Sequence, residues 1–392
     1  MSDSRRFGTR CVFRLWALAV LPLLSALVGP ACGQDVAWLP EVTRSPPQPV
    51  LEQAGRIAPL LAADGSDPAD LSQWQVQRKL VRQQWLQFLG PMPEPPALDV
   101  KVVTSEQVGT VVRQLVEYTG EPGLRVQGYL LVPHETVPLP SGAAYAGKRP
   151  AVAALHQTTN VSIDEIAGVS GPDAMQIGLK LARRGFIVFC PRCFLWQDVS
   201  SLNEAVQRHR SRHPQTLGMA KMLYDASRAV DLLSDMQQVD SQQISAIGHS
   251  LGAKEVLYLA ALDERVRAAV SCEGGLGFRS TNWDAEWYLG PAIRDPQFPL
   301  NHHQLLALAA PRPLLIVGGE SGPGAADGDR SWVLINAAPL RGPGGELAGA
   351  VSSFRDITRR IEAERRLRVS ENQYRNLVES LQEGVLQVNK DL

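Results

Sequence analysis

The middle of the chain alternates between short apolar runs and longer segments that have one apolar face. Apolar residues recur at steps of three and four in the segment Met219, Leu223, Ala226, Val230 and Leu233, which predicts a long helix there. Further helices are predicted over 173–184 and 251–262. Five apolar runs have the length of buried strands: 150–155, 186–190, 243–247, 266–271 and 313–317. Strands that alternate with helices predict an α/β fold, with a mostly parallel sheet and helices on both faces.

The segment before these runs has a different pattern. Residues 34–110 are rich in proline and polar turns, with a helical patch at Leu71–Leu89, and we interpret them as a lead-in that packs on the main domain. Alternating apolar and polar residues over 110–118 and 125–132 flank Gly120-Glu121-Pro122-Gly123, which predicts a β-hairpin.

Residues 1–33 have the composition of a secretory signal peptide. Arg5, Arg6, Arg10 and Arg14 precede an apolar run from Leu15 to Val28, and small residues follow it. We therefore predict a secreted or periplasmic protein; an uncleaved membrane anchor is the alternative. The formal net charge of −1 gives no reason to expect a nucleic-acid partner.

The string Gly248-His249-Ser250-Leu251-Gly252 lies between a predicted strand and a predicted helix. Such a tight turn admits only small residues beside the serine and lifts its hydroxyl above the sheet edge. We predict Ser250 as the nucleophile and the Leu251 N–H as one donor to an oxyanion. The second donor is predicted to be the N–H of Gln157 or Thr158, after the strand 150–155.

Carboxylates and aromatic residues follow the later strands. A triad acid must orient a histidine and stabilise its positive charge. Asp327, after the strand 313–317, is the preferred acid, followed by Asp329 and then Glu320; a solvated turn or a cation-binding loop is the alternative for this segment. Glu273, Trp283 and Trp287 lie in loops after the strand 266–271, and we interpret them as a substrate rim, with core capping as the alternative for the two tryptophans.

Residues 111–332 resemble bacterial α/β-hydrolases of the acetyl xylan esterase and dienelactone hydrolase-like group. The resemblance implies a serine carboxyl-ester hydrolase that needs no cofactor or metal and acts on small esters or acylated sugars. It rests on these segments: Leu155-His156-Gln157-Thr158, Ala229-Val230-Asp231-Leu232-Leu233, Val239-Asp240, Ile247-Gly248-His249-Ser250-Leu251-Gly252, Leu262-Asp263-Glu264-Arg265-Val266 and Ala310-Pro311-Arg312-Pro313-Leu314.

The catalytic histidine that the resemblance implies should follow the acid, but no histidine follows Trp332 in this sequence. Without a base, a serine hydroxyl is a poor nucleophile at neutral pH, so we expect impaired activity. His302 and His303 precede the last predicted strand. We expect them on a helix surface near the site rim, and a relocated base is the alternative.

Residues 333–392 resemble the closing strands of a PAS sensor domain with its outgoing helix. The resemblance rests on Phe354-Arg355-Asp356-Ile357-Thr358 and Ser370-Glu371-Asn372-Gln373-Tyr374-Arg375. This PAS-like strand pair and long helix would replace the last strand and helix of the hydrolase, with Leu347–Phe354 paired on the sheet edge. Heptad spacing of Leu367, Tyr374 and Leu381 indicates a weak homodimer.

The chain therefore divides into a signal peptide (1–33), a lead-in (34–110), a hydrolase domain (111–332) and a PAS-like fragment (333–392). Two further functions remain open at this point: a PAS-linked signalling protein, and a carbohydrate-binding relic of the hydrolase fold without catalysis.

Overall fold

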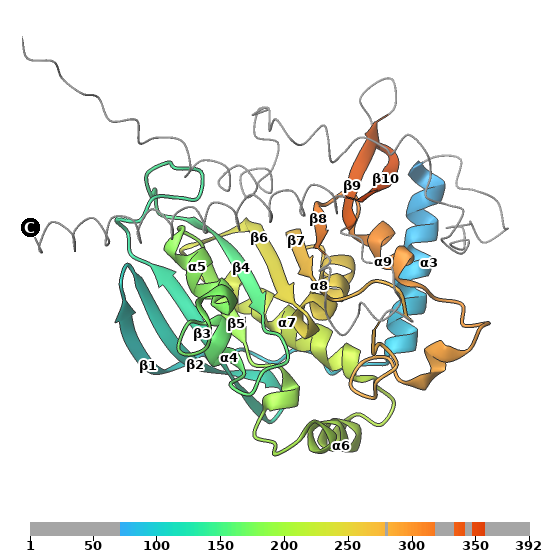
Figure 1. Cartoon of the computed structure of the whole chain (residues 1–392), viewed down its shortest axis with the longest axis horizontal. Coiled ribbons are helices and arrows are strands. Elements are labelled where there is room, and N and C mark those ends of the chain that lie inside the picture. The colour runs from blue at the N-terminus through green and yellow to red at the C-terminus, as the bar shows by residue number, and fades with distance from the viewer. Residues whose placement is uncertain (1–70, 279–280, 318–332, 342–346, 357–392) are drawn as a thin grey trace, which may run out of the picture.

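A computed structural model describes residues 71–278 and 281–317, together with the backbone of two strands, 333–341 and 347–356 (Figure 1). The predicted signal peptide and the C-terminal helix lie outside the described residues. The helices are α3 (Leu71–Leu89), α4 (Ile163–Ile166), α5 (Ile177–Arg183), α6 (Leu202–Arg212), α7 (Gly218–Asp235), α8 (Leu251–Leu262) and α9 (His302–Ala309). The strands are β1 (Lys101–Val108), β2 (Val111–Glu121), β3 (Leu124–Pro133), β4 (Arg149–Leu155), β5 (Ile187–Pro191), β6 (Val239–His249), β7 (Val266–Cys272), β8 (Leu314–Val317), β9 (Val333–Arg341) and β10 (Leu347–Asp356).

These strands form one sheet in the order β1-β2-β3-β5-β4-β6-β7-β8-β9-β10. The five central strands are β5, β4, β6, β7 and β8, and they pair in parallel, as their apolar runs predicted. An antiparallel unit of β1, β2 and β3 extends one end of the sheet, and the hairpin predicted over 110–132 is its β2–β3 pair. The fold is therefore the predicted α/β-hydrolase sheet.

Helices cover both faces of the parallel strands, and the alternation of side chains along β4 shows how the two layers divide. Ala151, Ala153 and Leu155 face the core under α3, α7, α8 and α9. Val152 and Ala154 face the opposite core, under α4 and α5. Successive side chains of a strand point to opposite faces, so residues 150–155 of this strand are all apolar because both of its faces are buried.

The structure differs from the sequence predictions at three elements. The helix predicted over 173–184 is broken at Gln176, whose ψ of 50° is not helical, so a 3₁₀ turn (173–175) precedes α5. Strand β1 lies inside the predicted lead-in, and its side chains are almost all exposed, so it lacks the alternating pattern of a half-buried strand. Helix α6 has a strongly polar sequence and was also missed.

The far end of the sheet is a β9–β10 hairpin that adjoins β8 through the pair Ile316 and Ile335 (Figure 1). The segment Leu347–Phe354, expected on the hydrolase sheet edge, pairs with β9 instead, and β9 is the strand that adjoins β8. The PAS resemblance of this hairpin stays a prediction.

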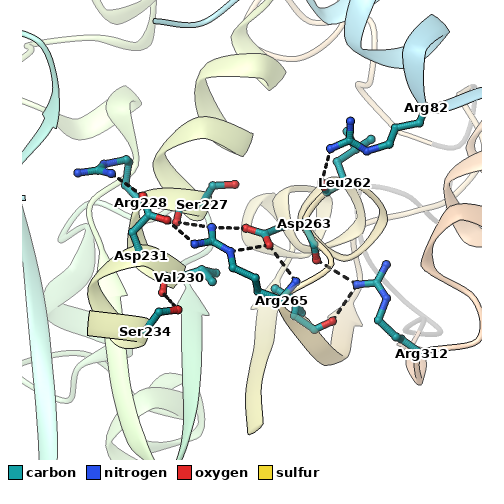
Figure 2. Close-up of polar contacts among 11 residues, drawn as sticks. Arg82, Ser227, Arg228, Val230, Asp231, Ser234, Leu262, Asp263, Arg265 and Arg312 are labelled. Atoms are coloured by element: carbon teal, nitrogen blue, oxygen red, sulfur yellow. Dashed lines mark hydrogen bonds and ion pairs between the residues drawn. The ribbon is translucent and has the colours of Figure 1, made fainter. Parts of the chain in front are cut away.

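A polar network joins helix ends at the amino ends of the parallel strands (Figure 2). Arg265 forms ion pairs with Asp263, at 2.7 Å, and with Asp231 of α7, at 2.5 Å. Arg312 donates to the carbonyl oxygens of Asp263 and Val266, at 3.0 and 2.8 Å. These residues belong to segments that carried the family resemblance, and here they lie at the opposite end of the sheet from Ser250, where they stabilise the fold.

Candidate active site

Ser250 lies in the turn between β6 and α8, at the carboxyl edge of the parallel strands. Its φ of 53° and ψ of −108° place a non-glycine residue in a strained conformation at the N-cap of α8. The Ser250 N–H donates to the Cys272 carbonyl at the end of β7, at 2.8 Å. The turn is therefore fixed from the neighbouring strand, and Ser250 is left partly exposed at the sheet edge.

The two glycines of the turn have no room for a side chain. A Cβ on Gly248 would lie 2.2 Å from the Gly252 carbonyl oxygen. A Cβ on Gly252 would lie 2.2 Å from the Leu155 carbonyl oxygen and 2.9 Å from that of His156. Backbone atoms make these contacts and cannot rotate away, so the turn and the end of β4 touch only because both positions are glycine. This is the tight geometry that the sequence predicted.

The two predicted oxyanion donors come from elements that meet at this turn. Leu251 is the first residue of α8, and the first N–H groups of a helix have no partner within it. Gln157 and Thr158 follow β4 directly, and Gln157 is buried whereas Thr158 is exposed. The structure thus brings the predicted serine and both predicted donor segments to one edge of the sheet.

His156, in the second donor segment, is buried and hydrogen-bonded on both ring nitrogens. Its Nδ1 lies 2.8 Å from the Gln157 carbonyl oxygen, and its Nε2 accepts from the Cys193 N–H at 3.2 Å. Burial lowers its pKa to about 4, so the ring is neutral at physiological pH. It cannot accept the proton of the serine hydroxyl without giving up one of these bonds.

Glu273, predicted at a substrate rim, lies directly after β7 and beside Ser250. It follows Cys272, which accepts the Ser250 N–H, and its own φ is 59°. Its carboxylate Oε2 lies 3.2 Å from Nε2 of His249, and the side chains of His249 and Glu273 are 21% and 43% exposed. A solvent-accessible carboxylate paired with an imidazole therefore lies at the same edge as the serine, a combination that the sequence reasoning did not single out.

The acids preferred from the sequence, Asp327 and Asp329, lie outside the described residues. The strand that precedes them, β8, is present next to β7, and the Val317 carbonyl accepts the Glu273 N–H at 2.7 Å. The chain therefore leaves β8 beside Glu273. Both aspartates remain predictions.

His302 was expected on a helix surface, and this expectation was wrong. It is 0% exposed, with Nδ1 2.6 Å from the Leu276 carbonyl and Nε2 2.8 Å from the Tyr258 hydroxyl. Trp85, Trp283 and Phe278 pack around its ring. Burial lowers its pKa to about 3, and the ring serves the core instead of the serine. The neighbouring His303 is half-buried on α9.

Of the two tryptophans predicted at a substrate rim, Trp283 is fully buried and Trp287 is half-buried. The core alternative is therefore correct for Trp283, whose ring lies 4.0 Å from Nζ of Lys254. Lys254 is also buried, and its ammonium donates to the carbonyl oxygen of Gly274 at 2.6 Å. Burial lowers the Lys254 pKa to about 7. This lysine ties the segment after β7 to α8, and no feature of the sequence marked it.

The Cys190–Cys193 pair at the end of β5 is not arranged for redox chemistry. Both thiols are free and buried, and burial raises both of their pKa values.

Across residues 71–278 and 281–317, no group of three or more His, Cys, Asp and Glu side chains is placed to hold a metal ion. Within the same residues, no helix is both long enough and apolar enough to cross a membrane.

Comparisons with known proteins agree with this geometry. A sequence model of the dienelactone hydrolase family matches residues 144–318. A glucuronoyl esterase from Solibacter usitatus superimposes with a TM-score of 0.54 at 20% identity, over 72% of this chain and 84% of that one. A promiscuous CE15 esterase from a marine bacterial metagenome gives a TM-score of 0.51 at 18% identity, over 72% and 82%. A search of curated protein sequences gave no significant match. The fold is that of the α/β-hydrolases, and the matched family and structures are carboxylic ester hydrolases by name.

Proposed function

We propose that this chain is a serine carboxyl-ester hydrolase that acts on esters of carbohydrates or on similar small esters. The observation that carries the proposal is the strained turn at Ser250, closed by two glycines at the start of a helix. The carbohydrate part of the proposal is supported by the names of the structural neighbours, which are glucuronoyl and CE15 esterases.

The proposed reaction begins when Ser250 Oγ forms a bond to the ester carbonyl carbon and its proton passes to a base. The carbonyl oxygen becomes an oxyanion, which is stabilised by the Leu251 N–H and by an N–H of Gln157 or Thr158. Collapse of the adduct breaks the bond to the alkoxide, which takes up a proton. Water then releases the acid from the acyl-enzyme, and the serine is restored.

The acid and base of this reaction are open to proposal because no histidine follows Trp332. His156 and His302 have both ring nitrogens engaged in the core. His249 precedes Ser250 in the chain, is partly exposed and is paired with the solvent-accessible Glu273, so its ring is not held in the core. We therefore propose weak turnover, several orders of magnitude below that of an intact triad, with Asp327 or Glu273 as the carboxylate.

The first test identifies the nucleophile by covalent labelling, which does not require turnover. Three proteins are treated with a fluorophosphonate: the full chain, its Ser250→Ala variant and a Ser211→Ala control on the exposed surface of α6. Mass spectrometry then measures the mass added to each protein. We expect one adduct in the wild type and the control, and none in Ser250→Ala. Labelling that is unchanged in Ser250→Ala contradicts the assignment of the nucleophile.

The second test measures turnover of an aryl acetate and of an acetylated xylo-oligosaccharide by the same proteins. We expect slow, Ser250-dependent release of acetate, further reduced in a His249→Phe variant. Saturable oligosaccharide binding with no Ser250-dependent hydrolysis would favour the non-catalytic relic instead.

Two further proposals concern the ends of the chain. We propose export directed by residues 1–33, and a weak homodimer through the helix predicted after Asp356. The export proposal is tested by fractionating cells that express the full chain, with cleavage near Gly33 read by N-terminal sequencing. The dimer is tested by light scattering of chains with and without residues 357–392.

The PAS-linked signalling alternative finds no support in the described residues, because β9 and β10 extend the hydrolase sheet.

A further inference from the structure

We propose that His156 and Trp196 are positioning residues that make the Thr158 N–H, and not the Gln157 N–H, the second oxyanion donor. This inference rests on the proposed function and deepens it. It concerns the segment 155–159 between β4 and α4, which the sequence left with two equivalent candidate donors.

The hydrogen bonds of His156 fix its protonation. A backbone N–H can only donate, so Nε2, which receives the Cys193 N–H, carries no proton. The proton of the neutral ring is therefore on Nδ1, which donates to the Gln157 carbonyl oxygen at 2.8 Å. Because the ring is buried, it stays in this single tautomer through the neutral range. His156 thus acts as a clamp between the segment after β4 and the segment after β5.

The clamp sets the direction of the Gln157–Thr158 peptide. In a trans peptide the C=O and the following N–H point in opposite directions. Since the Gln157 C=O is turned towards the buried His156 ring, the Thr158 N–H is turned away from the core. Among the described residues no hydrogen bond uses this N–H, and Thr158 is exposed where Gln157 is 6% exposed.

Further contacts hold the residues on either side of Thr158. The Trp196 Nε1–H donates to the Thr159 carbonyl at 2.8 Å, and the indole packs edge-on against the His156 ring with centroids 5.0 Å apart. On the other side, the Gln157 amide donates to the buried Glu165 carboxylate. The residues before and after Thr158 are therefore both fixed.

The segment lies directly against the start of α8. A Cβ built on Gly252 would meet the backbone of Leu155 and His156 first, so the chain leaves β4 in contact with the helix turn that begins two residues before Gly252, at Ser250. A Thr158 N–H that points away from the core at this position is directed to the edge that also carries the Leu251 N–H, the first N–H of helix α8. Electrostatic preorganisation of this kind requires that the donor does not move during the reaction.

The first experiment tests the clamp without relying on activity. Nitrogen-15 NMR of histidine-labelled full chain should show His156 as the neutral Nδ1–H tautomer from pH 5 to pH 8, assigned with a His156→Asn variant. A ring that is protonated on Nε2, or that titrates near pH 6.5, would overturn the proposal.

The second experiment removes one N–H at a time by replacing a residue with its α-hydroxy acid, which turns the amide into an ester. The readout is the rate of fluorophosphonate labelling of Ser250. We expect the replacement at Thr158 to lower this rate about 100-fold, and the matched replacement at Gln157 to leave it within about threefold of wild type. The opposite ranking, or equal effects, would contradict the choice of donor.

Side-chain variants complete the test. His156→Leu and Trp196→Phe should each lower the labelling rate, whereas His156→Asn, which keeps a donor near the Nδ1 position, should restore most of it. Equal loss in His156→Leu and His156→Asn would mean a packing role and would overturn the positioning role. If Ser250 does not label at all, the proposed function fails, while the NMR result still decides whether the clamp exists.

Discussion

At Ser250 the backbone adopts a conformation that every residue except glycine takes up at a cost. A φ of 53° with a ψ of −108° brings the Cβ of the serine close to its own backbone, and such positions store about 1–3 kcal/mol. The turn keeps this strain because the Ser250 N–H bond to Cys272 and the contact between Gly252 and β4 leave no relaxed alternative. Ser250 is held partly exposed at the sheet edge as a result.

The strain predicts an unusual order of stability among variants of this residue. Ser250→Gly should raise the free energy of unfolding by about 1 kcal/mol or more relative to Ser250→Ala, because glycine adopts this φ without steric cost. Glycine normally destabilises a folded protein relative to alanine, so the sign is diagnostic. Urea unfolding of the two variants measures the difference. Ser250→Ala as the more stable variant would show that the turn is not strained.

At the same scale, the sequence predicted residues with local roles and failed on residues with distant partners. The glycines and the serine could be placed because the turn needs them at fixed spacing within five residues. His302 could not, because its surroundings come from α3, α8 and the segment after β7, which only the folded chain brings together. Lys254 escaped notice for the same reason: its partners, Gly274 and Trp283, are 20 or more residues away.

Among the elements, helices α8 and α9 each have an arginine from another helix that donates hydrogen bonds to a carbonyl group of the last turn. Arg82 donates to the Leu262 carbonyl of α8 at 3.0 Å (Figure 2), and Arg78 donates to the Leu308 carbonyl of α9 at 2.9 Å. The last four carbonyls of a helix lack partners within it, and a cation also interacts favourably with the negative end of the helix. Helix α3, which carries Arg78 and Arg82, thereby joins the lead-in to the hydrolase domain.

Arg312 offers a test of how strongly arginine contacts with backbone carbonyl groups stabilise this fold. Arg312→Ala should lower the free energy of unfolding by about 2 kcal/mol, because the carbonyl groups of Asp263 and Val266 lose their guanidinium donor. The Ser250 labelling rate should not change, since these contacts lie at the opposite end of the sheet. Chemical unfolding and fluorophosphonate labelling measure the two quantities.

The matched control is Arg294→Ala, which removes an exposed arginine paired with Asp284. The Arg294 side chain is 70% exposed, and an ion pair in that environment contributes about 0–1 kcal/mol. Equal losses in the two variants would mean that the carbonyl contacts of Arg312 stabilise the fold no more than an exposed ion pair does.

Elements with a buried apolar face were predicted well from the sequence, and exposed ones were not. Helices α3 and α8 have the predicted bounds, and the parallel strands agree within a few residues. For α6, a signal was present and went unused: Ser201 and Glu204 have the spacing of a capping box, and the Ser201 hydroxyl accepts the Glu204 N–H at 3.2 Å. For β1, burial supplies no signal, because only pairing with β2 holds it.

For the whole molecule, the β9–β10 hairpin closes the end of the sheet that would otherwise expose β8. A four-residue apolar strand with an open edge is a template for pairing with other chains. The sequence predicted that a strand from the C-terminal segment would pair here. Which of the two strands lies next to β8 became clear only from the folded sheet.

Truncation measures this protective role. A chain that ends at residue 332 should aggregate on purification, whereas one that ends at residue 356 should remain as well behaved as the full chain. Size-exclusion chromatography with light scattering separates these outcomes. A monodisperse 332-residue chain would show that the edge of β8 needs no cover.

The close contact between Gly252 and the end of β4 also constrains how this molecule can be changed by mutation. Because no side chain fits at Gly248 or Gly252, we expect substitutions at these two positions to disrupt the turn that holds Ser250. Positions with steric room for new side chains lie elsewhere, for example at the exposed residues that follow β7 and precede α9 in the described part of the chain. An engineer would therefore diversify those loops and leave the turn untouched.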